Sequence, residues 1–255
     1  MADLPAPEMR QGYLGLGQAF DVASDPAIRT VDFTGAGVPL RAYFPAPAAS
    51  GPVIVYFHGG GWVIGDLDTH DPLCRVIAAV SGLRVVAVDY RLAPEHPFPA
   101  AHDDCLVAAR LVASSPAELE APVTGIAVAG DSAGGNLAFY VAGKLGAAGA
   151  LAQMLFYPVA DCTRGDSGSY AEFAEGYLLD RRLMDRFIGD YLPGGAGADD
   201  PAVSPLLHPA LADLPPAVVV TAGLDPLRDQ GRELAARMIG QGVEPHYSEA
   251  TGRIH

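Results

Sequence analysis

The stretch Ile126-Ala-Val-Ala-Gly-Asp-Ser-Ala-Gly-Gly135 runs from apolar residues through a Gly-x-Ser-x-Gly pentapeptide into helix-forming residues. A strand, a tight turn and a helix in this order would hold the Ser132 hydroxyl on a sharp turn above the edge of a sheet. A serine in that position is a candidate nucleophile, provided that a base can remove its proton. The alternative is structural, because Ser132 or Asp131 can also cap a helix that begins at Ala133.

Apolar segments of strand length alternate with helical segments on both sides of this stretch. We expect strands over residues 30–33, 39–44, 52–57, 83–88, 125–129, 151–157, 217–221 and 243–249. We expect helices over residues 9–20, 71–80, 100–113, 133–145, 180–191 and 227–239. Strands that are apolar throughout, with helices between them, predict an α/β domain with a mostly parallel sheet covered on both faces.

The composition limits the class of protein and its partners. The chain has 255 residues, half of them apolar, which suits one large domain, and its formal net charge of −14 argues against nucleic acid or anionic membrane as partner. No apolar run reaches the length of a membrane span, and residues 1–8 lack the features of a signal peptide. An odd number of cysteines (Cys74, Cys105 and Cys162) indicates reduced thiols rather than a disulfide or metal framework. We therefore expect a cytoplasmic protein without a membrane span or bound metal.

Residues 161–215 interrupt the alternation of strands and helices. This insertion holds one predicted helix, residues 180–191, and the loose stretch Pro193-Gly-Gly-Ala-Gly-Ala-Asp-Asp-Pro201. Long insertions between core strands often form lids over active sites, so we expect a small helical cap here. The alternative is a surface excursion without a role in function.

The glycine-rich segment His58-Gly-Gly-Gly-Trp62 follows directly after the predicted strand at residues 52–57. Without side chains in the way, N–H groups there can point at a negative charge that develops during a reaction. We expect the N–H groups of Gly59, Gly60 and Ala133 to form an oxyanion hole. A phosphate-binding loop is the alternative, but Gly59-Gly-Gly61 does not match Gly-x-Gly-x-x-Gly, and no Lys-Ser/Thr pair follows it.

A nucleophilic serine of this kind needs a base and an acid that orients the base. When the nucleophile lies on a strand–turn–helix, the chain order is serine, acid, histidine. Asp225 follows the predicted strand at residues 217–221 and is our candidate acid. Asp225-Pro226 can also be a helix cap and first turn, and Asp229, about one turn further on, is the reserve candidate.

Only His246 and His255 follow Asp225 in the chain. His246 lies inside the predicted last strand, whereas His255 lies in the loop beyond it, at the end where the other candidate groups gather. We therefore assign His255 as the base. The histidines that precede Asp225 are expected to have structural or cap roles; they include His70, His96, His102 and His208.

Two motifs, His58-Gly-Gly-Gly61 and Gly130-Asp-Ser-Ala-Gly-Gly135, together resemble the bacterial hormone-sensitive-lipase-like esterases of the α/β-hydrolase superfamily. The resemblance runs from about residue 30 to the last residue. Further motifs carry it: Asp89-Tyr-Arg-Leu-Ala-Pro-Glu95, Tyr157-Pro158, Ser204-Pro-Leu206, Asp225-Pro-Leu-Arg-Asp229 and Gly252-x-x-His255. It implies an α/β-hydrolase fold in which a central, mostly parallel sheet is flanked by helices.

The resemblance also implies one domain over residues 1–255, with a cap built from about residues 1–30 and 161–215. Members of the family usually carry Gly-Phe and then a closing helix after the histidine that matches His255. We therefore expect the closing helix to be absent from these 255 residues.

The activity that the resemblance implies is that of a serine carboxylesterase, which hydrolyses short- to medium-chain acyl esters through an acyl-enzyme without a cofactor. The nucleophile, acid and base would be Ser132, Asp225 and His255, with Gly59, Gly60 and Ala133 as the oxyanion donors. Asp131 would shape the turn, and Asp89 with Arg91 would brace the core near the site.

Other functions and partners stay open from the sequence. Amide or peptide hydrolysis by the same residues is one alternative, and a non-catalytic ligand-binding protein on a hydrolase scaffold is another.

An apolar acyl pocket can be lined by Trp62, Tyr157 and Tyr177, although aromatic residues at such positions are often core. Because the cap is modest, we expect small acyl groups. Family members often pair through the last strand and helix, so a homodimer is a further alternative.

Overall fold

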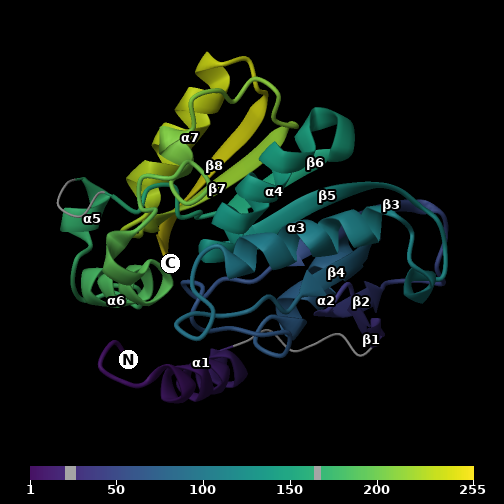
Figure 1. The fold of residues 1–255 in the computed structure, drawn as a ribbon, viewed down its shortest axis with the longest axis horizontal. Helices are drawn as coiled ribbons and strands as arrows, with labels where there is room; N and C mark the ends of the chain where they lie inside the picture. Colours follow the sequence, from purple (N-terminus) through teal and green to yellow (C-terminus); the bar gives the residue numbers. More distant parts are fainter. Residues whose placement is uncertain (21–26, 164–167) are drawn as a thin grey trace.

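Eight strands form one sheet in the order β1-β2-β4-β3-β5-β6-β7-β8. The computed structural model describes residues 1–20, 27–163 and 168–255 (Figure 1). β2 pairs antiparallel with β1 and with β4, and every other neighbouring pair in the sheet is parallel. The strands are β1 (Arg29–Gly35), β2 (Val38–Phe44), β3 (Gly51–Phe57), β4 (Arg84–Val88), β5 (Val123–Asp131), β6 (Ala152–Phe156), β7 (Ala217–Leu224) and β8 (Pro245–Ile254).

Helices connect the strands and flank the sheet. They are α1 (Ala6–Phe20), α2 (Asp71–Ser81), α3 (Ala100–Ala113), α4 (Ala133–Gly149), α5 (Ser169–Glu172), α6 (Arg181–Tyr191) and α7 (Arg228–Gly240). Every strand and helix expected from the sequence is present, with ends that differ by a few residues. The α/β fold and the mostly parallel sheet are therefore confirmed. The four-residue α5 was not expected.

The two faces of the sheet have separate apolar cores because side chains alternate along each strand. In β3, Val53, Val55 and Phe57 point to one face and join a cluster that includes side chains from α3, α4 and α7. Ile54 and Tyr56 point to the other face and join a smaller cluster with α2. This packing holds the ends of β3 and β5 side by side, and the glycine segment and Ser132 follow directly after those ends.

The two parts of the expected cap lie next to each other. Figure 1 shows α1, α5 and α6 beyond the sheet, on the side where the last residue of the chain also lies. On α6, Arg186 donates hydrogen bonds to the carbonyl oxygens of Ala2 and Leu4, and Arg182 pairs with Asp3. The parts of the expected cap at residues 21–26 and 164–167 lie outside the described residues.

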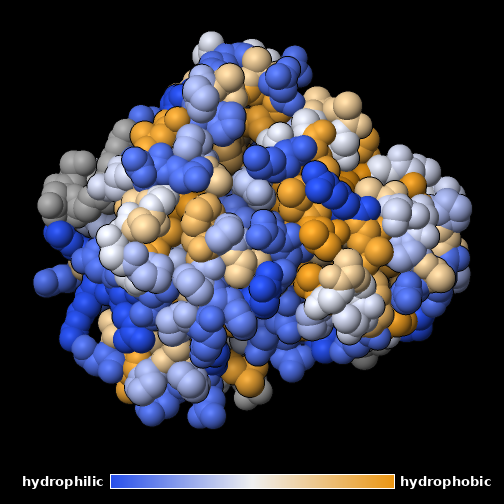
Figure 2. Space-filling view, in the orientation of Figure 1, coloured by the Kyte–Doolittle hydropathy of each residue, from blue (hydrophilic) through white to orange (hydrophobic). Residues whose placement is uncertain are grey.

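The surface on the side that Figure 2 draws is mainly polar. Figure 2 shows a mainly hydrophilic face on which apolar side chains form separate groups. Within residues 1–20, 27–163 and 168–255, no helix has both the length and the apolar character needed to cross a membrane.

Candidate active site

Ser132 lies between the end of β5 and the start of α4, on a backbone that non-glycine residues rarely adopt. Its φ is 54° and its ψ is −118°. A Cβ at Gly130 would lie 2.3 Å from the carbonyl oxygen of Gly134, and one at Gly134 would lie 1.9 Å from that of Phe57. Only glycine therefore fits on either side of this turn. The Ser132 side chain makes no helix-capping hydrogen bond, so Ser132 is not a side-chain cap of α4.

The Ser132 hydroxyl meets an imidazole and a carboxylate from two later parts of the chain. Ser132 Oγ lies 2.9 Å from His255 Nε2, and His255 Nδ1 lies 2.8 Å from Asp225 Oδ2. The Asp225 side chain is fully buried, and 15% of the His255 side chain is exposed. An ionised carboxylate only accepts hydrogen bonds, so Nδ1 carries the proton and Nε2 accepts from Ser132. The structure thus brings the three predicted side chains together.

Asp225 and His255 had competing candidates, Asp229 for the acid and His246 for the base, and neither of these contacts Ser132 in the structure. Asp225 follows β7, and its second oxygen accepts the Leu227 N–H at 2.8 Å, which fixes the carboxylate. The Asp229 carboxylate instead accepts the Ser169 N–H at 2.8 Å. His246 lies inside β8, as expected.

Asp131, directly before the nucleophile, forms a buried network that the sequence did not predict. Its Oδ1 accepts the Tyr56 hydroxyl at 2.6 Å and the Gly59 N–H at 3.0 Å, and it lies 3.5 Å from His70 Nε2. Burial alone would raise the pKa of Asp131, but His70 and the Tyr56 hydroxyl lower it to about 2. The ionised Asp131 carboxylate therefore ties the glycine segment to the nucleophile turn.

The hydrogen bond from Gly59 to Asp131 changes the expected set of oxyanion donors. The Gly59 N–H is already used and does not face a reacting oxygen, so its predicted role is wrong. Among the described residues, the N–H groups of Gly60 and Gly61 have no hydrogen-bond partner. Ala133 is the first residue of α4, so its N–H has no partner within the helix. The free donors next to Ser132 are thus Gly60, Gly61 and Ala133.

Three aromatic residues were expected to line the substrate pocket, and each lies in a different environment: Trp62, Tyr157 and Tyr177. Trp62 is completely buried, which makes it part of the core rather than an open pocket wall. The Tyr157 ring meets the His255 ring edge-on, with 4.8 Å between the centroids. Tyr177 packs against Phe173 in the segment before α6.

Asp89 and Arg91, which the resemblance implies as braces of the core near the site, bond to separate partners. The Arg91 guanidinium binds both oxygens of Asp104 at 2.8 Å, and the Asp89 N–H donates to the carbonyl oxygen of Pro39. Arg91 therefore links the segment after β4 to α3.

Comparison with known proteins agrees with the fold. Residues 54–255 match the family described as alpha/beta hydrolase fold. The chain belongs to this family.

Three similar α/β-hydrolases bear names that state an activity. Carboxylesterase NlhH of Mycobacterium tuberculosis is 42% identical over 237 residues, which cover 89% of this chain and 73% of NlhH. The ethyl acetate hydrolase of Pseudomonas putida is 38% identical and the match covers 92% of this chain and 75% of that protein. An ester hydrolase from the metagenome of Lake Arreo was solved with a bipyridine phosphonate derivative. It has a TM-score of 0.91 and 40% identity, and the match covers 100% of this chain and 83% of that chain. The predicted resemblance to the hormone-sensitive-lipase-like esterases is confirmed.

Proposed function

We propose that this α/β-hydrolase is a serine carboxylesterase in which Ser132 is the nucleophile, His255 the general base and Asp225 the acid that orients it. The observation that carries the proposal is the unbroken hydrogen-bonded chain from Ser132 Oγ through His255 to Asp225. The enzyme class is that of carboxylic ester hydrolases, to which the similar proteins from M. tuberculosis and P. putida are assigned by name.

In the first half-reaction, His255 Nε2 takes the Ser132 proton while Oγ attacks the ester carbonyl carbon. Asp225 holds the proton on Nδ1 and stabilises the imidazolium that forms. The imidazolium then protonates the leaving alcohol, and an acyl group stays on Ser132. In the second half-reaction, His255 removes a proton from water, whose oxygen attacks the acyl carbon and releases the acid.

The negative charge on the carbonyl oxygen would be held by backbone donors. We propose Gly60 and Ala133 for this role, as expected from the sequence, together with Gly61 in place of Gly59. Such preformed donors stabilise the transition state without reorganising, and each contributes on the order of 10²–10³ in turnover.

Replacing the nucleophile tests the proposal directly. We expect Ser132→Ala to reduce the hydrolysis of p-nitrophenyl butyrate by at least about 10³-fold, because the acyl-enzyme can no longer form. A fluorophosphonate probe should label the parent protein and not the variant. Unchanged hydrolysis by Ser132→Ala would overturn the assignment, and so would labelling of a different residue.

Short acyl chains are the proposed substrates because the cap lies close to the glycine segment. A Cβ at Gly61 would lie 2.2 Å from the Phe187 ring of α6, so this helix packs directly on the segment. We expect p-nitrophenyl acetate and butyrate to have higher kcat/KM than the octanoate and the palmitate. A maximum at palmitate would contradict this preference.

We also propose a cytoplasmic location and a homodimer. Free and buried Cys74, Cys105 and Cys162 suit a reducing compartment. In the described sheet β8 pairs only with β7, which leaves one strand edge for a second copy. Size-exclusion chromatography with light scattering distinguishes a dimer from a monomer.

A further inference from the structure

Trp62, the residue after the three glycines, has a backbone that needs support. Its φ is 60°, a left-handed value that a bulky residue adopts only when its surroundings impose it. Gly60 and Gly61 immediately before it also have positive φ values, 110° and 59°. The direction of the N–H groups at Gly60 and Gly61 therefore depends on how firmly Trp62 is held.

Tyr191, the last residue of α6, holds the Trp62 side chain. The two rings stack with 4.5 Å between centroids and 8° between planes, and neither side chain is exposed. On the same helix, Phe187 packs over Gly61. The end of α6 thus covers the glycine segment at two neighbouring positions.

His102 on α3 fixes the Tyr191 ring in turn. Its Nδ1 lies 2.6 Å from the Tyr191 hydroxyl, and its Nε2 lies 3.0 Å from the carbonyl oxygen of Ala202. A carbonyl oxygen only accepts, so Nε2 carries the proton and Nδ1 accepts from Tyr191. Burial lowers the pKa of His102 to about 4, which keeps the ring neutral with this single arrangement.

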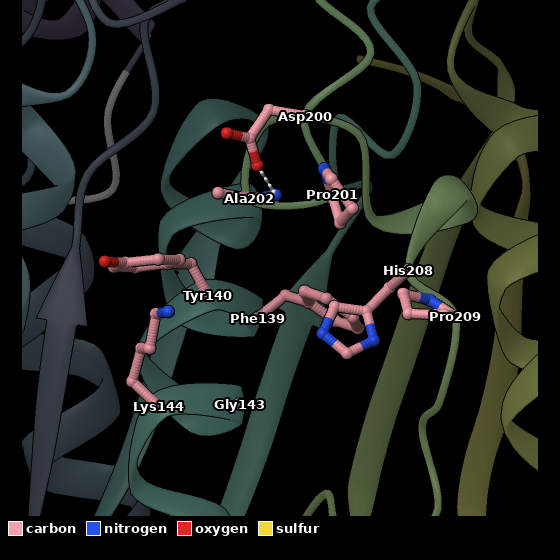
Figure 3. Close-up of a pocket in the computed structure, with 9 residues that line it drawn as sticks. All are labelled: Phe139, Tyr140, Gly143, Lys144, Asp200, Pro201, Ala202, His208 and Pro209. Atoms are coloured by element: carbon pink, nitrogen blue, oxygen red, sulfur yellow. Dashed lines mark hydrogen bonds between the residues drawn. The ribbon is translucent and has the colours of Figure 1, made fainter. Parts of the chain in front are cut away.

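Ala202, whose carbonyl oxygen accepts the hydrogen bond from His102, is itself held in place. Figure 3 shows Ala202 beside Asp200 at the wall of a cavity of about 230 Å³, with Tyr140 of α4 on another side. Asp200 accepts the Ala202 N–H at 2.8 Å, so hydrogen bonds hold the Ala202 backbone on both sides. Four parts of the chain therefore meet in one buried array: the glycine segment, α6, α3 and the segment around residue 202.

We propose that His102 and Tyr191 are positioning residues for ester hydrolysis, which hold Trp62 and thereby aim the N–H groups of Gly60 and Gly61 at the reacting oxygen. Neither residue touches the substrate in this role. The inference rests on the proposed function and adds two residues to it that lie outside the set of nucleophile, acid, base and oxyanion donors.

Tyr191→Phe is the mildest test, because it keeps the ring stack and removes only the hydroxyl that donates to His102. We expect kcat for p-nitrophenyl butyrate to fall about tenfold, less than the loss of a whole oxyanion donor, with KM within about twofold of the parent. Trp62 is the only tryptophan in the chain, so two signals free of tyrosine report on its surroundings: fluorescence excited at wavelengths that tyrosine does not absorb, and the long-wavelength tryptophan band of the near-UV circular dichroism spectrum. Both signals should change in Tyr191→Phe.

A matched pair of variants at position 102 tests the hydrogen bond itself. His102→Asn can place an acceptor near the position of Nδ1, whereas His102→Leu cannot accept from Tyr191 at all. We expect His102→Asn to keep more of the parent kcat than His102→Leu. Tyr140→Phe is the control, because its ring lies 4.5 Å from that of His102 but its hydroxyl takes no part in the array. It should match the parent in kcat and in the Trp62 signals.

Three outcomes would overturn the inference. An unchanged kcat in Tyr191→Phe would show that the array does not aim the donors, whatever the Trp62 signals do. A rise in KM alone would make Tyr191 a substrate-binding residue. Equal losses in His102→Asn and His102→Leu would exclude the hydrogen bond as the cause. Failure of the proposed function is distinguishable, because it would appear as an inactive parent or an active Ser132→Ala.

Discussion

Asp131 shows how one buried charge can organise the surroundings of a nucleophile. Its carboxylate accepts hydrogen bonds from β3 and from the glycine segment, and it lies near His70 just before α2. The same side chain belongs to the residue before Ser132. Loss of its charge should therefore weaken the fold and disturb the turn together.

We expect Asp131→Asn to lower the free energy of unfolding at pH 7 by about 2 kcal/mol, because the pKa of Asp131 is about 2 in the folded protein and near 4 in the unfolded chain. A lowered carboxyl pKa stabilises the fold above about pH 4, and this contribution is lost as the pH falls towards 2. The difference between parent and variant should shrink over that range in urea titrations. Asp213→Asn, at an exposed carboxylate, is the control. A difference that stays constant from pH 7 to pH 2 would contradict the prediction.

Site residues that are marked by a local sequence pattern could be predicted, whereas those whose role depends on a contact with a distant residue could not. Ser132, Asp225 and His255 were predicted because each follows or precedes a recognisable strand, and the chain order of their roles is fixed by the fold. Tyr56 and His70 were missed because their partner Asp131 is distant in sequence and nothing local marks the contact. Gly59 was wrongly assigned because the direction of an N–H group depends on backbone angles that composition does not reveal.

At the scale of elements, the junction of β5 and α4 explains why the sequence predicted a strand, a turn and a helix around Ser132. Gly130 and Gly134 let the first turn of α4 approach the end of β3 so closely that no side chain fits. The strands and longer helices were predictable because apolar runs and periodicity are local signals. The four-residue α5 has no such signal, since it is too short for a periodic pattern and depends on Asp229 for a hydrogen bond.

Two glycines of α4 give a matched pair for testing this junction. Gly134→Ala should destabilise the protein by more than about 4 kcal/mol or prevent folding, because the Phe57 carbonyl oxygen is part of the central strand and cannot move away. Gly143→Ala should stabilise the protein by about 0.5–1 kcal/mol, since the nearest atom to its Cβ would be 3.6 Å away and alanine favours helices. Soluble yield and thermal unfolding measure both effects. A Gly134→Ala protein as stable as Gly143→Ala would show that the close approach is not required.

At the scale of the whole molecule, acidic residues outnumber basic ones by 30 to 16. Some carboxylates therefore lie close to other carboxylates. Asp89, just after β4, is an example. Burial, together with the nearby Asp66 and Asp68 carboxylates, raises the pKa of Asp89 to about 6, although the Arg41 charge opposes this. Arg41 is itself shared among Asp32, Asp68 and Asp71, so its charge is divided among several carboxylates.

The raised pKa of Asp89 predicts how stability depends on pH. The folded protein holds the Asp89 proton up to about pH 6, whereas the unfolded chain releases it near pH 4, so stability falls as the pH rises from 4 to 6. Asp89→Asn cannot ionise and should avoid this loss. We expect the variant to have a higher Tm than the parent at pH 7.5 and the same Tm at pH 4, measured by circular dichroism. Asp213→Asn should show no such difference between the two pH values. A lower Tm for Asp89→Asn at pH 7.5 would mean that the ionised Asp89 carboxylate stabilises the fold, opposite to the effect derived from its burial.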